Sequence, residues 1–540
     1  MKAKSLFLAF LLLASSGAFA AELPPDRKIF DEDGDRIFEN LKARMAQVSA
    51  AERIPVLVQF REDTPIAGTL AVRLSHVLRG RKLKYSYANV PAVAASLTPA
   101  EIREALRDPM VEHVELDGVM KKAMATASPA FGVAQARQQF GFTGDGDGAP
   151  GTYTTKDVVI AVIDTGAQPT HPDLRGKILY FKDYVNRRAQ AYDDEGHGTH
   201  VAGVAAGAGK SNKDYAGVAP GAALVVFKVL GADGSGDISD GIAAIDECIS
   251  RKTQFNIRVM NLSLAVSGSS NGRDSFSAAC NRAVAAGIVT VVAAGNEGPN
   301  DRTIGSPSAA AGAITVGAGA DPGERGFYVA AFSSRGPTAD GRIKPDLWAP
   351  GVRLRSPQRT GGYSDPSGTS FAAPFVAGVA ALMIDAKPQI TPAALKAILL
   401  ATAARWAPGG RNSEFGAGRL QAYQAIARAA AITQNLQPPV SPRVKFVRGD
   451  IGIGEQQKFA INVLSTQYPV AVTLVLLNYP STNVELQIFS PSGARVARAE
   501  AIDRQETATF RPAGPGVYTL QLDAAIGATP YFLDISGDIE

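Results

Sequence analysis

The sequence predicts an α/β fold with a doubly wound, mostly parallel sheet, preceded by a small α+β unit and followed by an all-β sandwich. In the middle of the chain, short continuous apolar runs alternate with Ala- and Gly-rich helical segments, which is typical of a parallel sheet covered on both faces. Before this region, one amphipathic helix stands between strands. After a Pro-rich linker the helix signals stop, and alternating strands are separated by turns rich in Pro and Gly.

The first 20 residues have the pattern of a secretory signal peptide. Lys2 and Lys4 precede the apolar run 6–13, and Ala18-Phe19-Ala20 is a small-x-small cleavage motif. The apolar run is shorter than the ~20 residues that a membrane-spanning helix needs, and no other stretch is long enough. We therefore expect a secreted protein, extracellular or periplasmic, without a membrane span.

Residues 21–124 are expected to form a separate unit with a compact core at 53–123. Its strand signals lie in the runs IPVLVQF and VEHVELDG. Between these runs, Thr98 and Glu101 stand at the start of an amphipathic helix with the spacing of a capping box. A loose stretch, 124–128, separates the unit from the middle of the chain.

Residues 133–432 are expected to form the doubly wound domain. Strand and helix signals alternate through the segments VVIAVID, HVAGVAAGA, ALVVFKVL, SDGIAAIDECI, IRVMNLSL, SFSAACNRAVAAG, IVTVVAAGN and AITVGA. In such sheets, functional residues gather beyond the carboxyl ends of the strands. The later segment SGTSFAAPFVAG begins a helix without a polar face, which predicts burial on all sides.

Residues 433–443 form a Pro-rich linker, and residues 444–540 are expected to form the β-sandwich. The composition of the whole chain is that of a globular protein, with 46% hydrophobic and 20% charged residues. A net charge of +4, without a basic stripe interleaved with aromatic residues, argues against a nucleic-acid partner. Cys248 and Cys280 are a disulfide candidate in an exported chain, although the sequence leaves open whether their Cα atoms come within the ~7 Å that a bridge needs.

Three segments place reactive side chains at a strand end or a helix start. Asp164 ends an apolar strand, where a carboxylate needs partners because burying an unpaired charge is unfavourable. His197 stands between two glycines, and small neighbours allow close approach. Ser370 follows Gly368 and Thr369 at the start of the buried helix. Taken alone, Asp164 is more often a turn residue and a single histidine is more often structural.

Taken together, these residues supply a carboxylate, an imidazole and a hydroxyl. A serine hydroxyl is a poor nucleophile unless a base lies within hydrogen-bond reach and a third group orients that base. The chain order Asp, His, Ser is the order known from subtilisin, the established example.

The motifs VAVIDTG, HGTHVAG and SGTSFAAPFVAG resemble the three active-site motifs of the subtilisin-like serine peptidases (peptidase S8 family), and GVAPGAALVVFKVL, NLSL and AAGNEG resemble further signatures of that family. The resemblance implies that Ser370 attacks the scissile carbonyl, that His197 takes and returns its proton, and that Asp164 holds His197. It also implies that Asn296 is the oxyanion donor. Without the resemblance, the sequence at Asn296 would indicate a turn.

The family resemblance extends to both ends of the chain. The N-terminal unit resembles the family's propeptide, which helps folding and inhibits the enzyme, and the C-terminal unit resembles the β-sandwich behind many exported bacterial peptidases. The expected function is that of a secreted, self-processing serine endopeptidase that acts as a monomer on proteins or peptides through an acyl-enzyme. Self-cleavage is expected within 121–128. The alternatives are a catalytically silent subtilisin-like binding protein and a surface-binding protein that acts through its C-terminal sandwich.

The resemblance also implies a substrate-binding wall made by Ser263, Leu264 and Ala265, with Gly295 on the facing wall. Most relatives have two glycines where this chain has Ala265 and Val266. We expect the added methyl groups to narrow the pocket and to weaken the preference for large aromatic side chains.

Two further positions depart from the family pattern. Many relatives carry Met immediately after the nucleophile, whereas this chain has Phe371, so no thioether oxidises beside Ser370. The chemistry requires no cofactor, but structural calcium is common in the family. Asp173 matches a position that often binds calcium, whereas the companion loop GKSNKDYAG does not match, so the metal ligands stay open.

Overall fold

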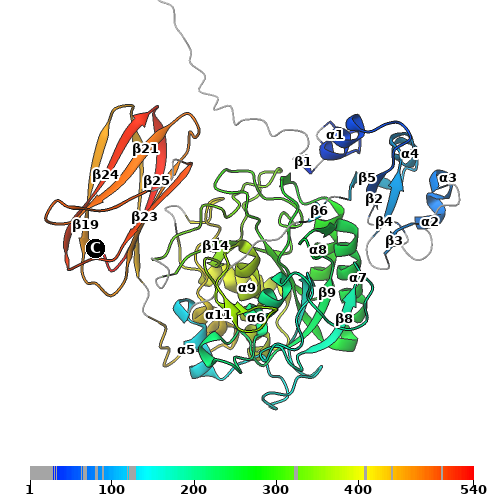
Figure 1. The fold of residues 1–540 in the computed structure, drawn as a ribbon, viewed down its shortest axis with the longest axis horizontal. Coiled ribbons are helices and arrows are strands. Elements are labelled where there is room, and N and C mark those ends of the chain that lie inside the picture. The colour runs from blue at the N-terminus through cyan, green and yellow to red at the C-terminus, as the bar shows by residue number, and fades with distance from the viewer. Residues whose placement is uncertain are drawn as a thin grey trace, which may run out of the picture.

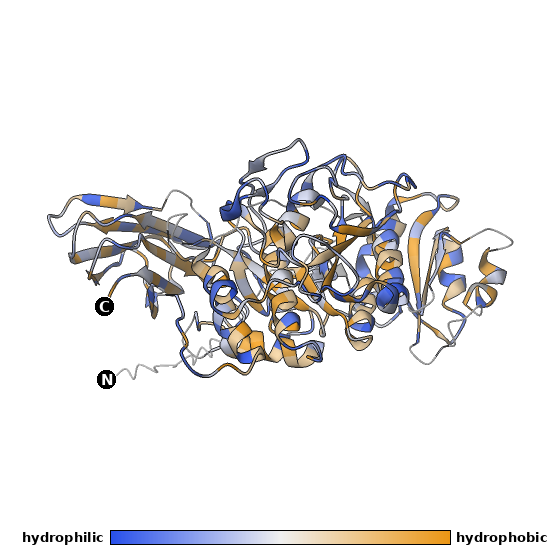
Figure 2. Ribbon diagram, turned by 90° about the horizontal axis from the view of Figure 1, so that it is seen from below, coloured by the Kyte–Doolittle hydropathy of each residue, from blue (hydrophilic) through white to orange (hydrophobic). Residues whose placement is uncertain are grey.

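A computed structural model describes residues 28–29, 31, 33–61, 64, 70–78, 83–87, 91–117, 119–120, 129–321, 326–406, 410–439, 442–499 and 503–540 (Figure 1). The expected signal peptide and the expected cleavage stretch 121–128 lie outside the described residues. The N-terminal unit and the C-terminal sandwich lie on opposite sides of a central domain in both views (Figures 1 and 2). Figure 2 shows hydrophobic residues concentrated in the strands and helices of the central domain.

The central domain contains the predicted parallel sheet, with seven strands in the order β15-β14-β13-β11-β7-β9-β8. All neighbouring strands are parallel. The bounds are β7 Val159–Asp164, β8 Ile178–Asp183, β9 Ala223–Lys228, β11 Ile257–Leu262, β13 Val289–Ala293, β14 Ile314–Gly319 and β15 Leu347–Pro350. Strands β11, β13, β14 and β15 follow on one side of β7, and β9 and β8 lie on the other. The chain therefore changes sides at β7, and the crevice at the carboxyl end of this strand is the topological switch point of the sheet.

Helices cover both faces of this sheet. One face carries α5 (Val133–Phe140), α6 (His197–Ala206), α9 (Thr369–Ala386), α10 (Pro392–Thr402) and α11 (Ala422–Ala429), and the other carries α7 (Ile238–Phe255) and α8 (Ser275–Ala285). Nearly every residue of α9 is buried, as its uniformly apolar sequence predicts. Among the described residues, α9 is also the one helix long and apolar enough to cross a membrane, but its burial identifies it as a core helix.

The N-terminal unit is a four-stranded antiparallel sheet with helices on one face. The strand order is β3-β4-β2-β5, with bounds β2 Ile54–Phe60, β3 Tyr85–Ser86, β4 Ala92–Leu97 and β5 Val111–Leu116, and the helices are α1 Glu39–Gln47, α2 Leu70–Arg73, α3 Ser75–Leu78 and α4 Pro99–Ala105. The predicted capping box of α4 is present, because Thr98 Oγ1 accepts from the Glu101 N–H and Glu101 Oε2 accepts from the Thr98 N–H. The other face of the sheet packs on α7 and α8 through Leu57, Ala92 and Ala94.

The C-terminal unit is the predicted sandwich of two four-stranded antiparallel sheets, ordered β18-β25-β20-β23 and β19-β24-β21-β22. The bounds are β18 Arg443–Ile451, β19 Gln456–Val463, β20 Val470–Leu476, β21 Asn483–Phe489, β22 Arg495–Arg498, β23 Gln505–Phe510, β24 Gly516–Ile526 and β25 Thr529–Gly537.

Strand β20 is buried on both faces. Val470, Val472 and Leu474 belong to the core of the sandwich. On the opposite face, a Cβ added at Gly326 of the central domain would lie 2.9 Å from the Cβ of Ala471. The first sheet of the sandwich therefore lies directly against the central domain, which explains why the run VAVTLVL is apolar except for Thr473.

The two cysteines do not form the predicted candidate disulfide, because both are free thiols in the structure. Cys248 of α7 and Cys280 of α8 are fully buried within the same hydrophobic layer between these helices and the sheet. Burial raises the pKa of both thiols. The cysteines therefore serve as small apolar core residues.

Candidate active site

The three reactive residues predicted from the sequence lie at the carboxyl edge of the sheet around β7. Asp164 is the last residue of β7, His197 is the first residue of α6, and Ser370 is the second residue of α9. The Nδ1 atom of His197 lies 2.7 Å from Oδ1 of Asp164, and both side chains are fully buried. The imidazole also packs against the ring of Phe371, with ring centroids 5.1 Å apart, so His197 lies beside the start of α9.

The absence of a side chain at Gly198 allows α6 to begin directly against β7. A Cβ at this position would lie 2.0 Å from the carbonyl oxygen of Gly166 and 3.1 Å from Oδ1 of Asp164. Any side chain here would therefore separate the imidazole-bearing helix from the strand that carries the carboxylate.

Ser370 is held by a reciprocal pair of hydrogen bonds with Ser263. The hydroxyl of Ser370 donates to the carbonyl oxygen of Ser263 at 2.9 Å, and the hydroxyl of Ser263 donates to the carbonyl oxygen of Ser370 at 2.5 Å. These contacts fix the start of α9 to the residue that follows β11. The N-terminus of a helix carries a partial positive charge and unpaired N–H groups, which stabilise negative charge nearby.

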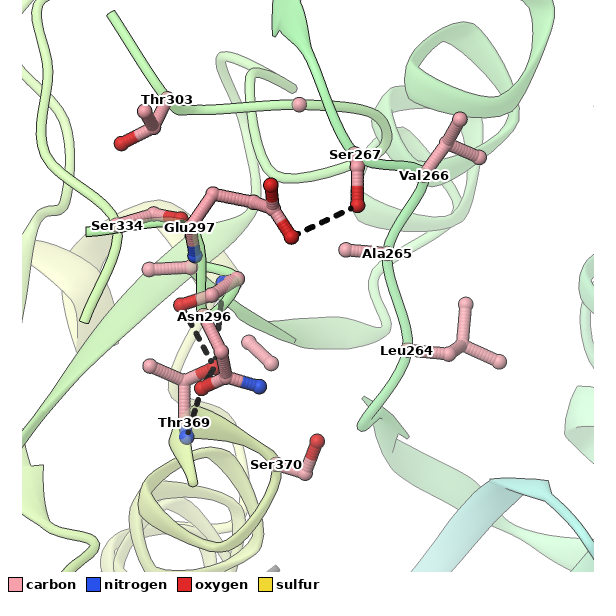
Figure 3. Close-up of a pocket in the computed structure, with 14 residues that line it drawn as sticks. Leu264, Ala265, Val266, Ser267, Asn296, Glu297, Thr303, Ser334, Thr369 and Ser370 are labelled. Carbon is pink, nitrogen blue, oxygen red and sulfur yellow. Dashed lines mark hydrogen bonds between the residues drawn. The ribbon is translucent and has the colours of Figure 1, made fainter. Parts of the chain in front are cut away.

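Asn296 lies beside Thr369, on the same side of the pocket as Ser370 (Figure 3). Its Oδ1 accepts hydrogen bonds from the N–H of Thr369 at 3.0 Å and from the hydroxyl of Thr369 at 3.1 Å. These two bonds orient the amide so that Nδ2 is directed into the pocket (Figure 3). An amide held in this way can donate to a developing oxyanion without carrying a charge of its own.

A cavity of about 160 Å³ opens between the segments 264–267 and 295–297, with Thr369 and Ser370 at one end. Of the predicted substrate-binding residues, Leu264, Ala265 and Gly295 line it directly, whereas Ser263 supports Ser370 from behind. Figure 3 shows the Ala265 methyl group directed across the cavity, while the Val266 side chain points away from it. Any narrowing of the pocket by this wall therefore comes from Ala265.

The opposite wall rests on Ser334. Gly295 has a φ of +105°, and a Cβ there would lie 2.8 Å from the Ser334 hydroxyl oxygen, so this position requires glycine. Ser334 donates its N–H to the Gly295 carbonyl oxygen at 3.0 Å, and its hydroxyl accepts from the Glu297 N–H at 3.1 Å. Across the cavity, the Ser267 hydroxyl donates to the Glu297 carboxylate at 3.1 Å (Figure 3).

Ser267, Glu297 and Ser334 also line the pocket, and their place there was not predicted from the sequence. All three are ordinary polar residues in loops, where no periodic pattern marks them, so only the folded backbone brings them together.

A buried polar network, also missed from the sequence, holds the loop that carries His197. The ammonium group of Lys228 is fully buried and donates to the carbonyl oxygens of Thr165 and Leu230 and to the Asp194 carboxylate at 2.6–2.8 Å. Asp193 accepts hydrogen bonds from the hydroxyl groups of Thr165 and Thr199. One signal could have revealed the network, because Lys228 is the single charge in the apolar run ALVVFKVL.

The environment of Asp173 does not fit a calcium ion. Its carboxylate accepts from the N–H groups of Lys210 and Ser211, at 2.6 and 3.3 Å, and from the Tyr363 hydroxyl at 2.7 Å. Calcium takes oxygen ligands, whereas donors already surround this carboxylate. Three other carboxylates, Asp145, Asp147 and Asp157, lie within 4.8 Å of one another, close enough to share a cation, and each also accepts a hydrogen bond from a neighbouring backbone N–H.

Two carboxylates of the N-terminal unit occupy the N-termini of α7 and α8. Glu115 accepts from the Ser275 N–H at 2.6 Å, and Asp117 accepts from the Ser239 N–H and hydroxyl at 2.7 and 2.5 Å. Negative charge is favoured at helix N-termini. The two carboxylates of the N-terminal unit therefore complement the N-termini of α7 and α8 on the surface that this unit covers. Beyond Asp117, the short strand β6 (Val119–Met120) pairs antiparallel with β10 (Gly236–Asp237) of the central domain.

A buried Asp–His pair at the switch point of a parallel sheet, with a serine at the start of the central helix, defines a serine peptidase of the subtilisin type. Comparison with known proteins agrees with this class. A family model described as the subtilase family matches residues 155–418, and one described as the Tk-SP N-propeptide domain matches residues 32–100.

Individual relatives give the same result. The chain is 36% identical over 405 residues to serine protease AprX of Bacillus subtilis (strain 168), a match that covers 69% of this chain and 88% of that protein. It is 33% identical over 373 residues to subtilisin E of the same organism, covering 68% of this chain and 89% of that protein. It is 42% identical over 236 residues to a subtilisin of Bacillus sp. (strain TA39), covering 41% and 55%. The chain belongs to the subtilase family of serine peptidases and carries an N-terminal propeptide.

Proposed function

We propose that the protein is a secreted serine endopeptidase that cleaves peptide bonds through Asp164, His197 and Ser370. The observation that supports this most strongly is the buried 2.7 Å contact between His197 Nδ1 and Asp164 Oδ1. A carboxylate at Nδ1 fixes the imidazole tautomer and leaves Nε2 as the basic nitrogen. Nε2 can then take the proton of Ser370, which a serine needs in order to act as a nucleophile.

In the proposed reaction, Ser370 Oγ bonds to the scissile carbonyl carbon while His197 Nε2 takes the hydroxyl proton. The carbonyl electron pair moves to the oxygen, where Asn296 Nδ2 and the backbone N–H of Ser370 at the start of α9 stabilise the negative charge. The C–N bond then breaks, the amine leaves with the proton from His197, and an acyl-enzyme remains. Water then attacks the carbonyl carbon of the acyl-enzyme while His197 Nε2 takes its proton. The ester bond breaks, the carboxylic acid leaves, and His197 returns the proton to Ser370 Oγ.

The protein is proposed to be made as an inactive precursor and to act as a monomer. The contacts of the N-terminal unit support the precursor, because its carboxylates Glu115 and Asp117 bind the central domain at two helix N-termini and its last described strand pairs with that domain. Cleavage is proposed within 121–128, between the two compact units, and the pattern of residues 1–20 supports export. A silent binding protein and a surface-binding protein are not favoured by any observation, because all three reactive residue types are present.

The test expresses the full chain beside Ser370→Ala and a control, Ser492→Ala, which removes an exposed hydroxyl of the sandwich. Wild type and control should be secreted, shortened to a product that starts within 121–128, active on peptides, and labelled by fluorophosphonate. Ser370→Ala should stay at precursor length and remain unlabelled. Equal lengths for all three chains, together with an unlabelled and inert wild type, would overturn the proposal.

A further inference from the structure

The C-terminal sandwich contacts the central domain directly behind the substrate pocket. Arg504, which precedes the edge strand β23, is 7% exposed. Its Nη1 donates to the carbonyl oxygen of Pro299 at 2.5 Å. The same guanidinium pairs with both carboxylate oxygens of Glu414, at 3.2 and 2.5 Å. One side chain of the sandwich therefore joins two separate segments of the central domain.

Gln505 extends this contact. Its Nε2 donates to the carbonyl oxygen of Val329 at 2.7 Å, and its Oε1 accepts from Nη2 of Arg335 at 2.5 Å. Arg335 is fully buried and also donates to the carbonyl oxygen of Glu414 at 2.9 Å. The sandwich thus adds polar partners to two buried charged residues that also pair with each other, with Arg335 Nε 3.5 Å from Glu414 Oε2.

The segments that receive these contacts also build one wall of the pocket. The Gly298 N–H donates to the carbonyl oxygen of Phe332 at 2.9 Å, and a Cβ at Gly298 would lie 2.1 Å from the Ser333 carbonyl oxygen. Residues 295–299 are therefore packed tightly against residues 332–335. Ser334 then joins the two segments at the cavity itself, through its bonds to Gly295 and Glu297.

We propose that Arg504 is a positioning residue for the substrate pocket: by holding Pro299 and Glu414, it fixes the segment 295–299, which carries Gly295 and Asn296. This inference rests on the proposed peptidase function and deepens it. Arg504 acts through Pro299 and lies behind the wall, outside the cavity lining. Its effect can be large, because displacing a reacting or stabilising group by about 1 Å can lower a rate about 10²-fold.

The first test is Arg504→Met in the full chain, assayed well below its unfolding midpoint. Methionine keeps much of the side-chain volume but removes every donor. We expect kcat/KM to fall roughly 10-fold, in line with a partial displacement of the wall. We also expect the ratio of kcat/KM between peptides with small and large side chains at the cleaved residue to change, which a purely structural role would not produce.

Loss of Arg504 should also affect stability. Arg504→Met leaves the Glu414 carboxylate without one of its partners, which lowers the unfolding midpoint. Arg335 still pairs with Glu414 in this variant, with Nε 3.5 Å from Oε2, so we expect the protein to stay folded with a lower midpoint. If Arg504→Met does not fold, Arg504→Lys replaces it in the test. Lysine keeps the positive charge beside Glu414 but lacks the second donor group, so we again expect kcat/KM to fall and the selectivity ratio to change.

Ser536→Ala is the matched control. It removes another hydrogen bond between sandwich and central domain, from the Ser536 hydroxyl to the Phe327 carbonyl oxygen at 2.6 Å, and should lower the unfolding midpoint without changing selectivity. Folded Arg504 variants with kcat/KM and selectivity within twofold of wild type would overturn the inference, as would an equal selectivity change in Ser536→Ala. An inert wild type would instead overturn the proposed function.

Discussion

His197 Nδ1 lies 2.7 Å from Oδ1 of Asp164, and both side chains are excluded from solvent. Replacing Asp164 by Asn allows the side-chain amide to donate an N–H to Nδ1, which favours the imidazole tautomer whose Nε2 carries the proton and cannot accept another. We expect Asp164→Asn to lower kcat by ~10⁴ while the fold is retained. Steady-state kinetics on a peptide, with circular dichroism as the control for folding, test this. A kcat within tenfold of wild type would contradict the proposed role.

Removing the amide of Asn296 should slow the reaction without abolishing substrate binding. In subtilisin, the established example, loss of the oxyanion-hole asparagine lowers kcat by about 10²–10³. We expect Asn296→Ala to show a loss of this size in kcat with little change in KM. Thr369→Val, which removes one of the two donors that orient Asn296, should give a smaller loss. If Thr369→Val were the more damaging variant, the amide would not be the principal donor.

Ala265 is expected to limit the size of the side chain accepted at the cleaved residue, because its methyl group is directed across the cavity (Figure 3). Wild type should cleave after Ala or Leu faster than after Phe in peptides that differ only at that residue. Ala265→Gly should raise kcat/KM for the Phe peptide relative to the others, and Val266→Ala should shift the ratio less. Wild-type cleavage that is fastest after Phe would contradict this prediction.

The activity should survive mild peroxide because no thioether lies beside Ser370. Phe371 fills this position and packs its ring against both His197 and His200, with centroids 5.1 and 6.1 Å away. We expect Phe371→Met to lose activity during peroxide treatment, with a sulfoxide found at residue 371 by mass spectrometry. Equal rates of loss in wild type and variant would show that oxidation elsewhere inactivates the enzyme.

The stability of the sandwich interface should depend on pH through Asp534 of β25. Burial raises the pKa of this carboxyl to about 8, although Arg335 opposes the shift. The folded protein therefore keeps a proton that the unfolded chain, with a pKa of ~3.9, releases. The contribution of Asp534 to stability falls as pH rises from about 4 to about 8. The unfolding temperature of Asp534→Asn minus that of wild type should be larger at pH 8 than at pH 5. A pH-independent difference would contradict this assignment.

Much of the fold was predictable because a strand that is buried on both faces has a nearly continuous apolar sequence. The run VVIAVID is apolar up to Asp164 and forms β7, and the run IVTVVAAGN is apolar around a single Thr290 over the residues that form β13. The predicted site residues also share a local signature: each of Asp164, His197 and Ser370 stands where a buried element begins or ends. Parallel strands and their following helices bring such positions to one edge of a sheet.

Other features depend on contacts that the sequence does not announce. The free state of Cys248 and Cys280 follows from the packing of α7 and α8, which periodicity leaves undetermined. The helix α1 was not anticipated, because it buries only Leu41 and Met45 and its apolar pattern is weak. Arg504 looks like an ordinary charge in a loop, since its partners Pro299 and Glu414 are distant in sequence.

The two-sided burial of β20 has a consequence for how the enzyme can mature. Truncation at the linker 433–443 would uncover apolar surface of the central domain, including the ring of Trp406, which packs against Phe446, and the segment at Gly326, which lies against Ala471. Large uncovered apolar bands promote aggregation. We therefore expect the C-terminal sandwich to remain covalently attached in the mature enzyme and not to be removed after export.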